Sequence, residues 1–126
     1  MIFDAGILVA IDRDEPAAKG FIEAARHAGE TLRTTAPAVA QVWRDGSRQA
    51  RLSRLVAGLD VRPFTAAQVS LVGTLLRRSG ASDVVDAHLV ACAMRLDDTI
   101  ITSDLDDFTR LTAHLGEAEP RAKQWS

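Results

Sequence analysis

"SDVVDAHLVACAMRLDDTIITSDLDDF", residues 82–108, is the stretch that decides the fold class. Residues 82–96 are apolar on most sides at helical length, which predicts a buried helix. Residues 98–103 then predict a short strand, and residues 105–116 predict a second helix that ends at a glycine. A buried helix, a strand and another helix in succession indicate an α/β protein.

The rest of the chain repeats this alternation of apolar runs and helical patterns. Further strands are predicted at residues 1–5, 31–35 and 59–64. Further helices are predicted at residues 6–11, 15–28, 37–46, 47–58 and 65–78. The tail after residue 116 has no clear periodicity. The pattern predicts a three-layer α/β/α fold in which helices cover both faces of a central parallel sheet.

Length and composition predict one globular domain over residues 1–126, of which 47% are hydrophobic and 25% charged. The net charge is −2, so any contact with nucleic acid must come from a local patch. The single cysteine, Cys92, lies in an apolar run, which indicates a buried side chain and no internal disulfide. Without a signal-peptide pattern or an apolar run near the ~20 residues of a membrane span, we expect a cytoplasmic protein with no membrane contact.

Three aspartates fall where a ligand site is expected. Asp4 ends the first predicted strand, and Asp104 follows the strand at residues 98–103. In parallel sheets, ligands bind beyond the carboxyl ends of the strands. Asp86 lies within the apolar helix, where an ionised carboxylate is unfavourable unless it is paired or binds a metal. Close carboxylates repel by about 4 kcal/mol per pair at an effective dielectric of ~20, and a divalent cation removes that repulsion.

The acids other than Asp4 and Asp86 also have a ready structural interpretation. Asp83 follows Ser82 and suits the start of a helix, and Asp104 suits the N-cap of the last helix. Asp107 lies in the first turn of that helix, where acids stabilise the helix dipole. If the acids do bind a metal, the all-oxygen ligand set indicates Mg²⁺ or Mn²⁺ and not Zn²⁺.

Three motifs together resemble those of the PIN-domain family, with the spacing of VapC-type toxins from toxin–antitoxin pairs. They are "MIFDAG" (residues 1–6), "VVDAHLVACAMRL" (residues 84–96) and "IITSDLDDF" (residues 100–108), and the resemblance runs from residue 1 to about residue 115. It implies a PIN-like α/β/α fold and a Mg²⁺- or Mn²⁺-dependent ribonuclease, with tRNA among the candidate substrates. It also implies a homodimer that a small antitoxin protein inhibits.

The resemblance assigns roles to particular acids by position. Asp4, Asp86 and Asp104 match the family's catalytic metal ligands, while Asp83 and Asp107 are accessory candidates. The chain departs from the family at Gln41, where a glutamate is usual. An amide oxygen can still accept a hydrogen bond from a metal-bound water, but the site loses one negative charge. We therefore expect a weakened nuclease.

The predicted helices around residues 37–58 carry two further features. Asp45 lies one helical turn after Gln41, where it either replaces the missing carboxylate or is a solvated acid. Arg44, Arg48 and Arg51, followed by Arg54, are spaced 4, 3 and 3 residues apart, which predicts a stripe along one helical side. This stripe is either an RNA-binding ridge formed by Arg44, Arg48 and Arg51 or an ordinary solvated face.

Three alternative functions stay open. An inactive PIN-like module that binds RNA or an antitoxin is favoured by Gln41 and disfavoured by the retained aspartates. A phosphoryl-transfer receiver or phosphatase-like domain needs an acid pair at the first strand and a late lysine, whereas the only lysines are Lys19 and Lys123. In a purely structural α/β module, every acid would be a helix cap.

Overall fold

Five short parallel strands form the centre of the protein in the computed structural model, which describes residues 1–125. They are β1 (Ile2–Phe3), β2 (Arg33–Thr35), β3 (Asp60–Arg62), β4 (Ile100–Thr102) and β5 (Ala122–Gln124). The strand order is β3-β2-β1-β4-β5, and every neighbouring pair is parallel. The predicted parallel sheet is confirmed, and the tail adds the strand β5 at one edge.

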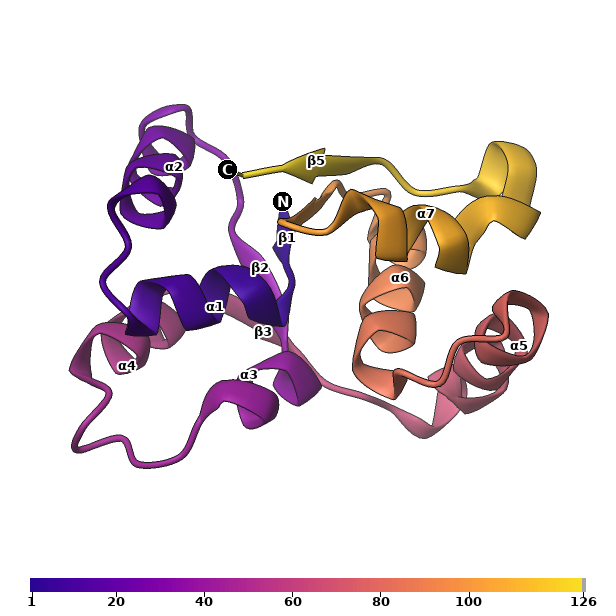
Figure 1. Cartoon of the computed structure of the whole chain (residues 1–126), viewed down its shortest axis with the longest axis horizontal. Helices are drawn as coiled ribbons and strands as arrows, with labels where there is room; N and C mark the ends of the chain where they lie inside the picture. The colour runs from indigo at the N-terminus through magenta and orange to yellow at the C-terminus, as the bar shows by residue number, and fades with distance from the viewer. Residues whose placement is uncertain (126) are drawn as a thin grey trace.

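Helices cover both faces of this sheet (Figure 1). They are α1 (Ala5–Asp12), α2 (Pro16–His27), α3 (Ala36–Val42), α4 (Ala50–Ala57), α5 (Val69–Ser79), α6 (Val84–Leu96) and α7 (Leu105–Thr112), with short 3₁₀ segments at Ala66–Gln68 and Ala113–Ala118. No helix within residues 1–125 has both the length and the apolar character that a membrane crossing needs. The three-layer α/β/α fold predicted from the sequence is confirmed.

Alternation along the two central strands divides the apolar side chains between two cores. Phe3 and Ile101 pack with the buried residues of α1, α2 and α4 on one face. Ile2 and Ile100 pack with those of α5, α6 and α7 on the other face. The helix α6 supplies seven consecutive buried residues, from Ala87 to Ala93, which confirms that it is a buried helix. Both central strands are therefore fixed from above and below, and so are the residues at their ends.

The segment between α3 and α4 differs from the prediction. The helix α3 ends at Val42 because Trp43 is extended (φ −68°, ψ 130°), and α4 begins only at Ala50. Residues 43–49 form a loop. Asp45 therefore does not extend the face of α3, and the predicted arginine stripe along one helical side is wrong.

Side-chain contacts within this loop explain why the helical pattern is interrupted. The Gln49 amide oxygen accepts hydrogen bonds from the backbone amides of Arg44 (2.8 Å) and Asp45 (3.1 Å). A Cβ atom on Gly46 would stand 2.7 Å from the Trp43 ring, so the indole packs directly against the glycine backbone. The Gln49 side chain thus accepts the hydrogen bonds that these two backbone amides would otherwise make within a continuous helix.

Candidate functional site

The carboxyl ends of β1 and β4 meet at the centre of the sheet. Asp4 directly follows β1 and its amide donates to the Ile101 carbonyl (3.1 Å), while Asp104 lies two residues beyond β4. The strand order reverses here, because β2 lies on one side of β1 and β4 on the other. Such a switch point is where open α/β sheets bind their ligands.

Three of the acids also cap helices that start at this edge. Asp4, Asp83 and Asp104 are the N-caps of α1, α6 and α7. Their Oδ1 atoms accept from the amides of Ile7 (3.2 Å), Asp86 (3.1 Å) and Asp107 (3.1 Å), respectively. The cap interpretation is thus confirmed for Asp83 and Asp104, whereas the cap role of Asp4 was not expected from the sequence. A cap bond uses one carboxylate oxygen, so it is compatible with a ligand site. The positive ends of three helix dipoles accompany these carboxylates.

The Asp86 carboxyl is affected by the charges of three other aspartates of this group. Asp86 occupies the first turn of α6 and is half-buried. Burial raises the pKa of its carboxyl to about 7, and the charges of Asp83, Asp4 and Asp107 add to the rise. The mutual repulsion expected from the sequence therefore exists in the fold, and it favours a positively charged ligand.

Asp4 is the most deeply placed of the three predicted ligands, with only 7% of its surface exposed. Burial raises the pKa of its carboxyl above the usual value. Hydrogen bonds from the Thr102 hydroxyl and from the amides of Ile7 and Gly6 act in the opposite direction. The charge of Asp104 adds to the rise.

Gly6, Thr102 and Ser103 belong to this site although sequence reasoning did not select them. A Cβ atom on Gly6 would stand 3.2 Å from both Asp4 Oδ1 and Ser103 Oγ, so the missing side chain leaves room for the carboxylate. The Thr102 hydroxyl accepts a hydrogen bond from the Asp104 amide (2.9 Å) and thereby holds the turn after β4. Hydroxyl residues at the end of an apolar strand are the signal that would have found two of them.

The donor chemistry fits a hard cation, but the acids are not assembled into a closed cage. Within residues 1–125, no three His, Cys, Asp or Glu side chains stand close enough together to hold a metal ion. Mg²⁺ usually takes one or two protein carboxylates, keeps several waters and completes its shell with substrate phosphates. Oxygen-only donors spread around an open edge suit that coordination better than they suit Zn²⁺.

Gln41 lies exposed in the last turn of α3, which packs against α1 and α6. Its side chain makes no hydrogen bond to any other residue of the described chain. The helix α3 begins at the same sheet edge as the acids, because it directly follows β2. The place of Gln41 at the site therefore stays a prediction of the family resemblance.

The three arginines predicted to bind RNA do not form a common surface, and each contacts groups close to it. The Arg44 guanidinium donates to the carbonyls of Ala40 (3.2 Å) and Trp43 (2.6 Å). Arg48 pairs with Asp45 (3.7 Å) in the loop. Arg51, on α4, donates to the Asp12 carbonyl (3.0 Å) and faces a different hollow.

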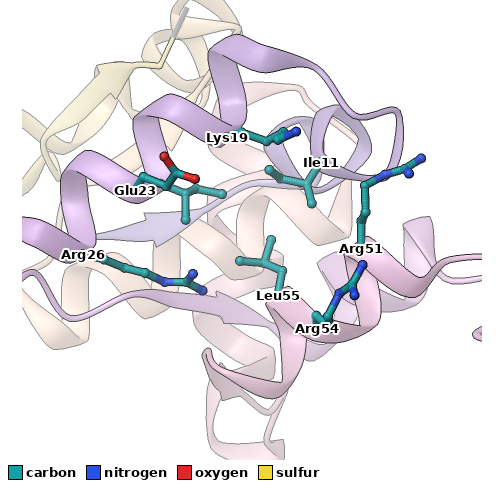
Figure 2. Close-up of a pocket in the computed structure, with 8 residues that line it drawn as sticks. Ile11, Lys19, Glu23, Arg26, Arg51, Arg54 and Leu55 are labelled. Carbon is teal, nitrogen blue, oxygen red and sulfur yellow. The ribbon is translucent and has the colours of Figure 1, made fainter.

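That hollow lies between α1, α2 and α4 and has a volume of about 210 Å³ (Figure 2). Its floor is apolar, from Ile11, Ile22 and Leu55. Four cations and one carboxylate surround this floor: Lys19, Arg26, Arg51, Arg54 and Glu23. We call it the basic groove. Its chemistry suits a segment with apolar and acidic side chains.

The comparisons with known proteins agree with this architecture. The model of the PIN domain matches residues 1–113. VapBC2 from Rickettsia felis, bound to a DNA fragment from its promoter, has a TM-score of 0.73 at 18% identity over 100% of both chains. VapBC-1 from nontypeable Haemophilus influenzae has a TM-score of 0.69 at 17% identity over 99% of this chain and 98% of that one.

FitAB bound to an IR36 DNA fragment has a TM-score of 0.62 at 16% identity, over 100% of this chain and 96% of that one. At these identities the solved structures show a shared fold. A search of curated protein sequences found no significant match.

Proposed function

The chain belongs to the PIN-domain family, and from this premise we propose that it is an endoribonuclease that depends on Mg²⁺ or Mn²⁺. The observation that carries the proposal is the gathering of aspartates at the switch point between β1 and β4, where burial and neighbouring carboxylates raise the pKa of Asp86 to about 7. Carboxylates that repel one another in a partly buried edge favour a divalent cation.

Asp4, Asp86 and Asp104 would hold the ion. When bound, a divalent ion activates water and stabilises charge on the scissile phosphate. The caps at α1 and α7 fix one oxygen of Asp4 and of Asp104, and the Thr102 hydroxyl and the Gly6 amide also hydrogen-bond to the Asp4 carboxylate, so both acids are held in place at this end of the sheet. Asp86 accepts no such bond from a helix amide in the described chain, so its carboxylate gains most from a nearby cation.

Gln41 bears on how strong this activity is. With an amide where the family usually has a glutamate, the site has one negative charge fewer, and we propose that cleavage is slower than a full set of acids would give. The alternative is an inactive PIN-domain module that binds RNA or an antitoxin, and Gln41 is the observation that favours it.

A cleavage assay on tRNA-sized RNA with Mn²⁺ or Mg²⁺ tests the nuclease. We expect Asp4→Asn and Asp86→Asn each to lower the rate by about 100-fold or more, because each removes a charge that acts on the metal and the phosphate. Asp106→Asn is the matched control, since Asp106 is exposed and does not act on the pKa of Asp86 or Asp4. Equal rates in wild type and in the Asp4 and Asp86 variants would show contamination and not catalysis.

A small antitoxin-like protein is the proposed partner, and the basic groove is its proposed docking surface. Support comes from the VapBC and FitAB structures of the same fold and from the charge of the groove. Homodimerisation stays a prediction of the family resemblance.

Co-purification with a small protein encoded beside this chain tests the docking surface. We expect the double variant Arg26→Glu and Arg54→Glu to lose the partner, because it reverses two of the charges around the apolar floor. Arg77→Glu with Arg78→Glu, on α5, is the control of equal charge change. Retention of the partner by the groove variant would place docking elsewhere.

A further inference from the structure

Besides the basic groove, the structure has a second cavity of about 210 Å³, and Asp86 is one of its lining residues. Its walls come from the end of α5 and residues 79–82, from the start of α6 and from α7. Asp4 and Asp104 are not among its lining residues, so it adjoins the proposed metal-binding edge and extends away from it. We call it the side cavity.

Acidic side chains outnumber basic ones in the lining of the side cavity. Three carboxylates line it, from Asp83, Asp86 and Asp107, together with one guanidinium, from Arg110. Arg110 is the one positively charged side chain among the lining residues of the described chain, so it is the group of this cavity that can contact an anion.

Arg110 is held so that its guanidinium can change partners. Its Nη2 atom stands 3.4 Å from Asp107 Oδ1, and the two side chains are 74% and 52% exposed. Exposed pairs of this kind contribute only about 0–1 kcal/mol, so an incoming anion can replace the carboxylate. The backbone of Arg110 is nevertheless fixed, because Phe108 and Leu111 on the same helix are each only 3% exposed.

From this geometry we propose that the side cavity binds a nucleotide flanking the scissile bond, with Arg110 as the residue that contacts its phosphate. This inference rests on the proposed RNA substrate. A polynucleotide that places one phosphate at the acids must continue past them, and the cavity of about 210 Å³ beside Asp86 offers space for a neighbouring nucleotide. A guanidinium binds phosphate oxygens through two parallel hydrogen bonds, which a lysine cannot do.

Binding of a fluorescein-labelled single-stranded RNA, measured with Ca²⁺ in place of Mn²⁺ over a range of salt concentrations, tests the proposal without requiring cleavage. We expect Arg110→Gln to weaken binding about tenfold and to reduce the slope of log affinity against log salt by about 0.7 to 1. Arg110→Lys should retain part of the affinity, because a point charge replaces the two-pronged contact. Arg95→Gln, at the other end of α6, is the control of equal charge change.

Two further measurements separate a phosphate contact from a structural role. Arg110→Gln should bind Mn²⁺ without RNA about twofold or more tightly, since a cation leaves the neighbourhood of the acids, although its RNA affinity falls. Where the wild type cleaves RNA, the variant should raise KM more than it lowers kcat.

The outcomes distinguish this inference from the proposed nuclease activity. RNA binding that depends on Arg110 in a protein without cleavage supports the side cavity and overturns the nuclease. Equal RNA affinity and salt slope in wild type and Arg110→Gln overturn the side cavity alone. A loss in Arg95→Gln as large as that in Arg110→Gln also overturns it, because the effect would then be one of overall charge.

Discussion

At the scale of single residues, Asp86 is a proposed metal ligand whose ionised carboxylate opposes folding. Burial and three neighbouring carboxylates raise the pKa of Asp86 to about 7, so its ionised form destabilises the folded protein when no cation is bound. We expect Asp86→Asn, without metal, to unfold with a free energy about 1–2 kcal/mol higher than wild type at pH 8, after allowance for solvent screening. Urea unfolding in EDTA measures the difference.

The raised pKa of Asp86 also determines how the stability of the folded protein changes with pH. A carboxyl whose folded pKa is raised above its unfolded value favours folding at low pH, and this advantage is lost as the pH rises from about 4 through about 7. Asp86→Asn cannot titrate, so its extra stability should disappear by pH 4.5. Asp106→Asn should stay within a few tenths of a kcal/mol of the wild type at both pH values, because Asp106 contributes only to the dipole of α7. A variant less stable than wild type at pH 8 would contradict the electrostatic account.

Gln41 gives a second prediction at the residue scale. If its side chain faces the acids, Gln41→Glu restores one negative charge near the ion and should tighten Mn²⁺ binding severalfold, with faster cleavage. Titration calorimetry with Mn²⁺ measures the affinity, and Arg95→Gln, in the last turn of α6, is the control of equal charge change. Unchanged affinity in Gln41→Glu would show that residue 41 lies outside the site.

At the scale of elements, the starts of α6 and α7 were predictable from the sequence, whereas the end of α3 and the start of α4 were not. Asp83 and Asp104 each lie three residues before the amide that they cap, which is a local pattern. The end of α3 at Val42 depends on packing between Trp43 and Gly46 and on the bonds of Gln49, which no local periodicity reveals. The arginine stripe failed for this reason.

The strand β5 and the side cavity also depend on contacts distant in sequence. Residues 122–124 are exposed and carry no apolar strand pattern, and they form a strand because β4 offers an unpaired edge. The side cavity joins α5, α6 and α7, so its lining could not be read from any one motif. The acids at the strand ends were predictable because the carboxyl ends of neighbouring parallel strands necessarily meet.

The start of α1 yields a prediction at this scale. Gly6→Ala puts a methyl group 3.2 Å from both Asp4 Oδ1 and Ser103 Oγ, so the carboxylate or the serine must shift by a few tenths of an ångström. We expect metal-dependent cleavage to fall by about tenfold or more, because small misplacements of catalytic groups slow reactions strongly. Gly20→Ala, within α2, meets nothing within 4 Å and should instead gain about 0.5–1 kcal/mol of stability with unchanged cleavage. Full activity in Gly6→Ala would show that Asp4 tolerates displacement.

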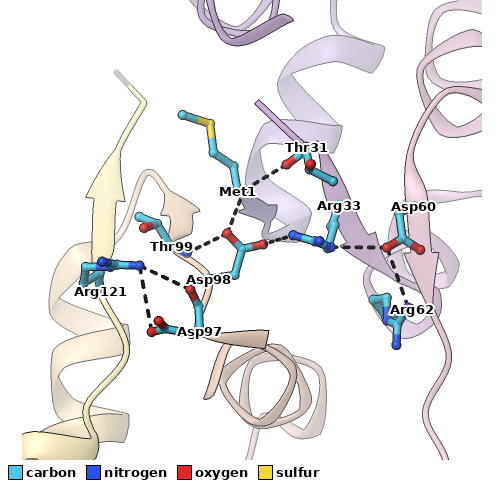
Figure 3. A network of polar contacts seen from close by, with 9 residues as sticks. All are labelled: Met1, Thr31, Arg33, Asp60, Arg62, Asp97, Asp98, Thr99 and Arg121. Atoms are coloured by element: carbon cyan, nitrogen blue, oxygen red, sulfur yellow. Dashed lines mark hydrogen bonds and ion pairs between the residues drawn. The ribbon is translucent and has the colours of Figure 1, made fainter. Parts of the chain in front are cut away.

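At the scale of the whole molecule, the charged side chains at the carboxyl ends of the strands are arranged differently from those at the amino ends. At the carboxyl ends of the strands, like charges gather and repel. At the amino ends, opposite charges pair around Asp98, whose side chain is 11% exposed (Figure 3). Asp98 contacts the Met1 amino group (2.7 Å) and Arg33 Nη1 (2.8 Å), and Arg33 also reaches Asp60 (3.2 Å). This network joins the starts of β1, β2, β3 and β4.

Because the paired charges and the proposed metal ligands lie at opposite ends of the strands, we expect that a substitution among the paired charges changes stability without changing activity. Burial alone would raise the pKa of Asp98, but its hydrogen bonds to the Met1 amino group, Arg33 and the Thr99 amide outweigh that effect and lower it. Asp98→Asn removes the carboxylate that pairs with the Met1 amino group and one of the two carboxylates that pair with Arg33, and we expect it to lower the free energy of unfolding by about 2–4 kcal/mol at pH 7. Cleavage per folded molecule should not change, because the acids lie at the opposite ends of the strands.

The pH dependence of Asp98→Asn has the opposite sign to that of Asp86→Asn. A lowered folded pKa gives stability that is present above the unfolded value of about 3.8 and is lost as the pH falls through the folded value. The deficit of Asp98→Asn should therefore shrink below pH 4, whereas its neighbour variant Asp97→Asn, whose side chain is 99% exposed, should resemble wild type throughout. Thermal unfolding across pH, with cleavage rates corrected for the folded fraction, measures both effects. A large loss of cleavage per folded molecule would show that the two edges of the sheet are coupled through β1 and β4, since those two strands carry both groups of charges.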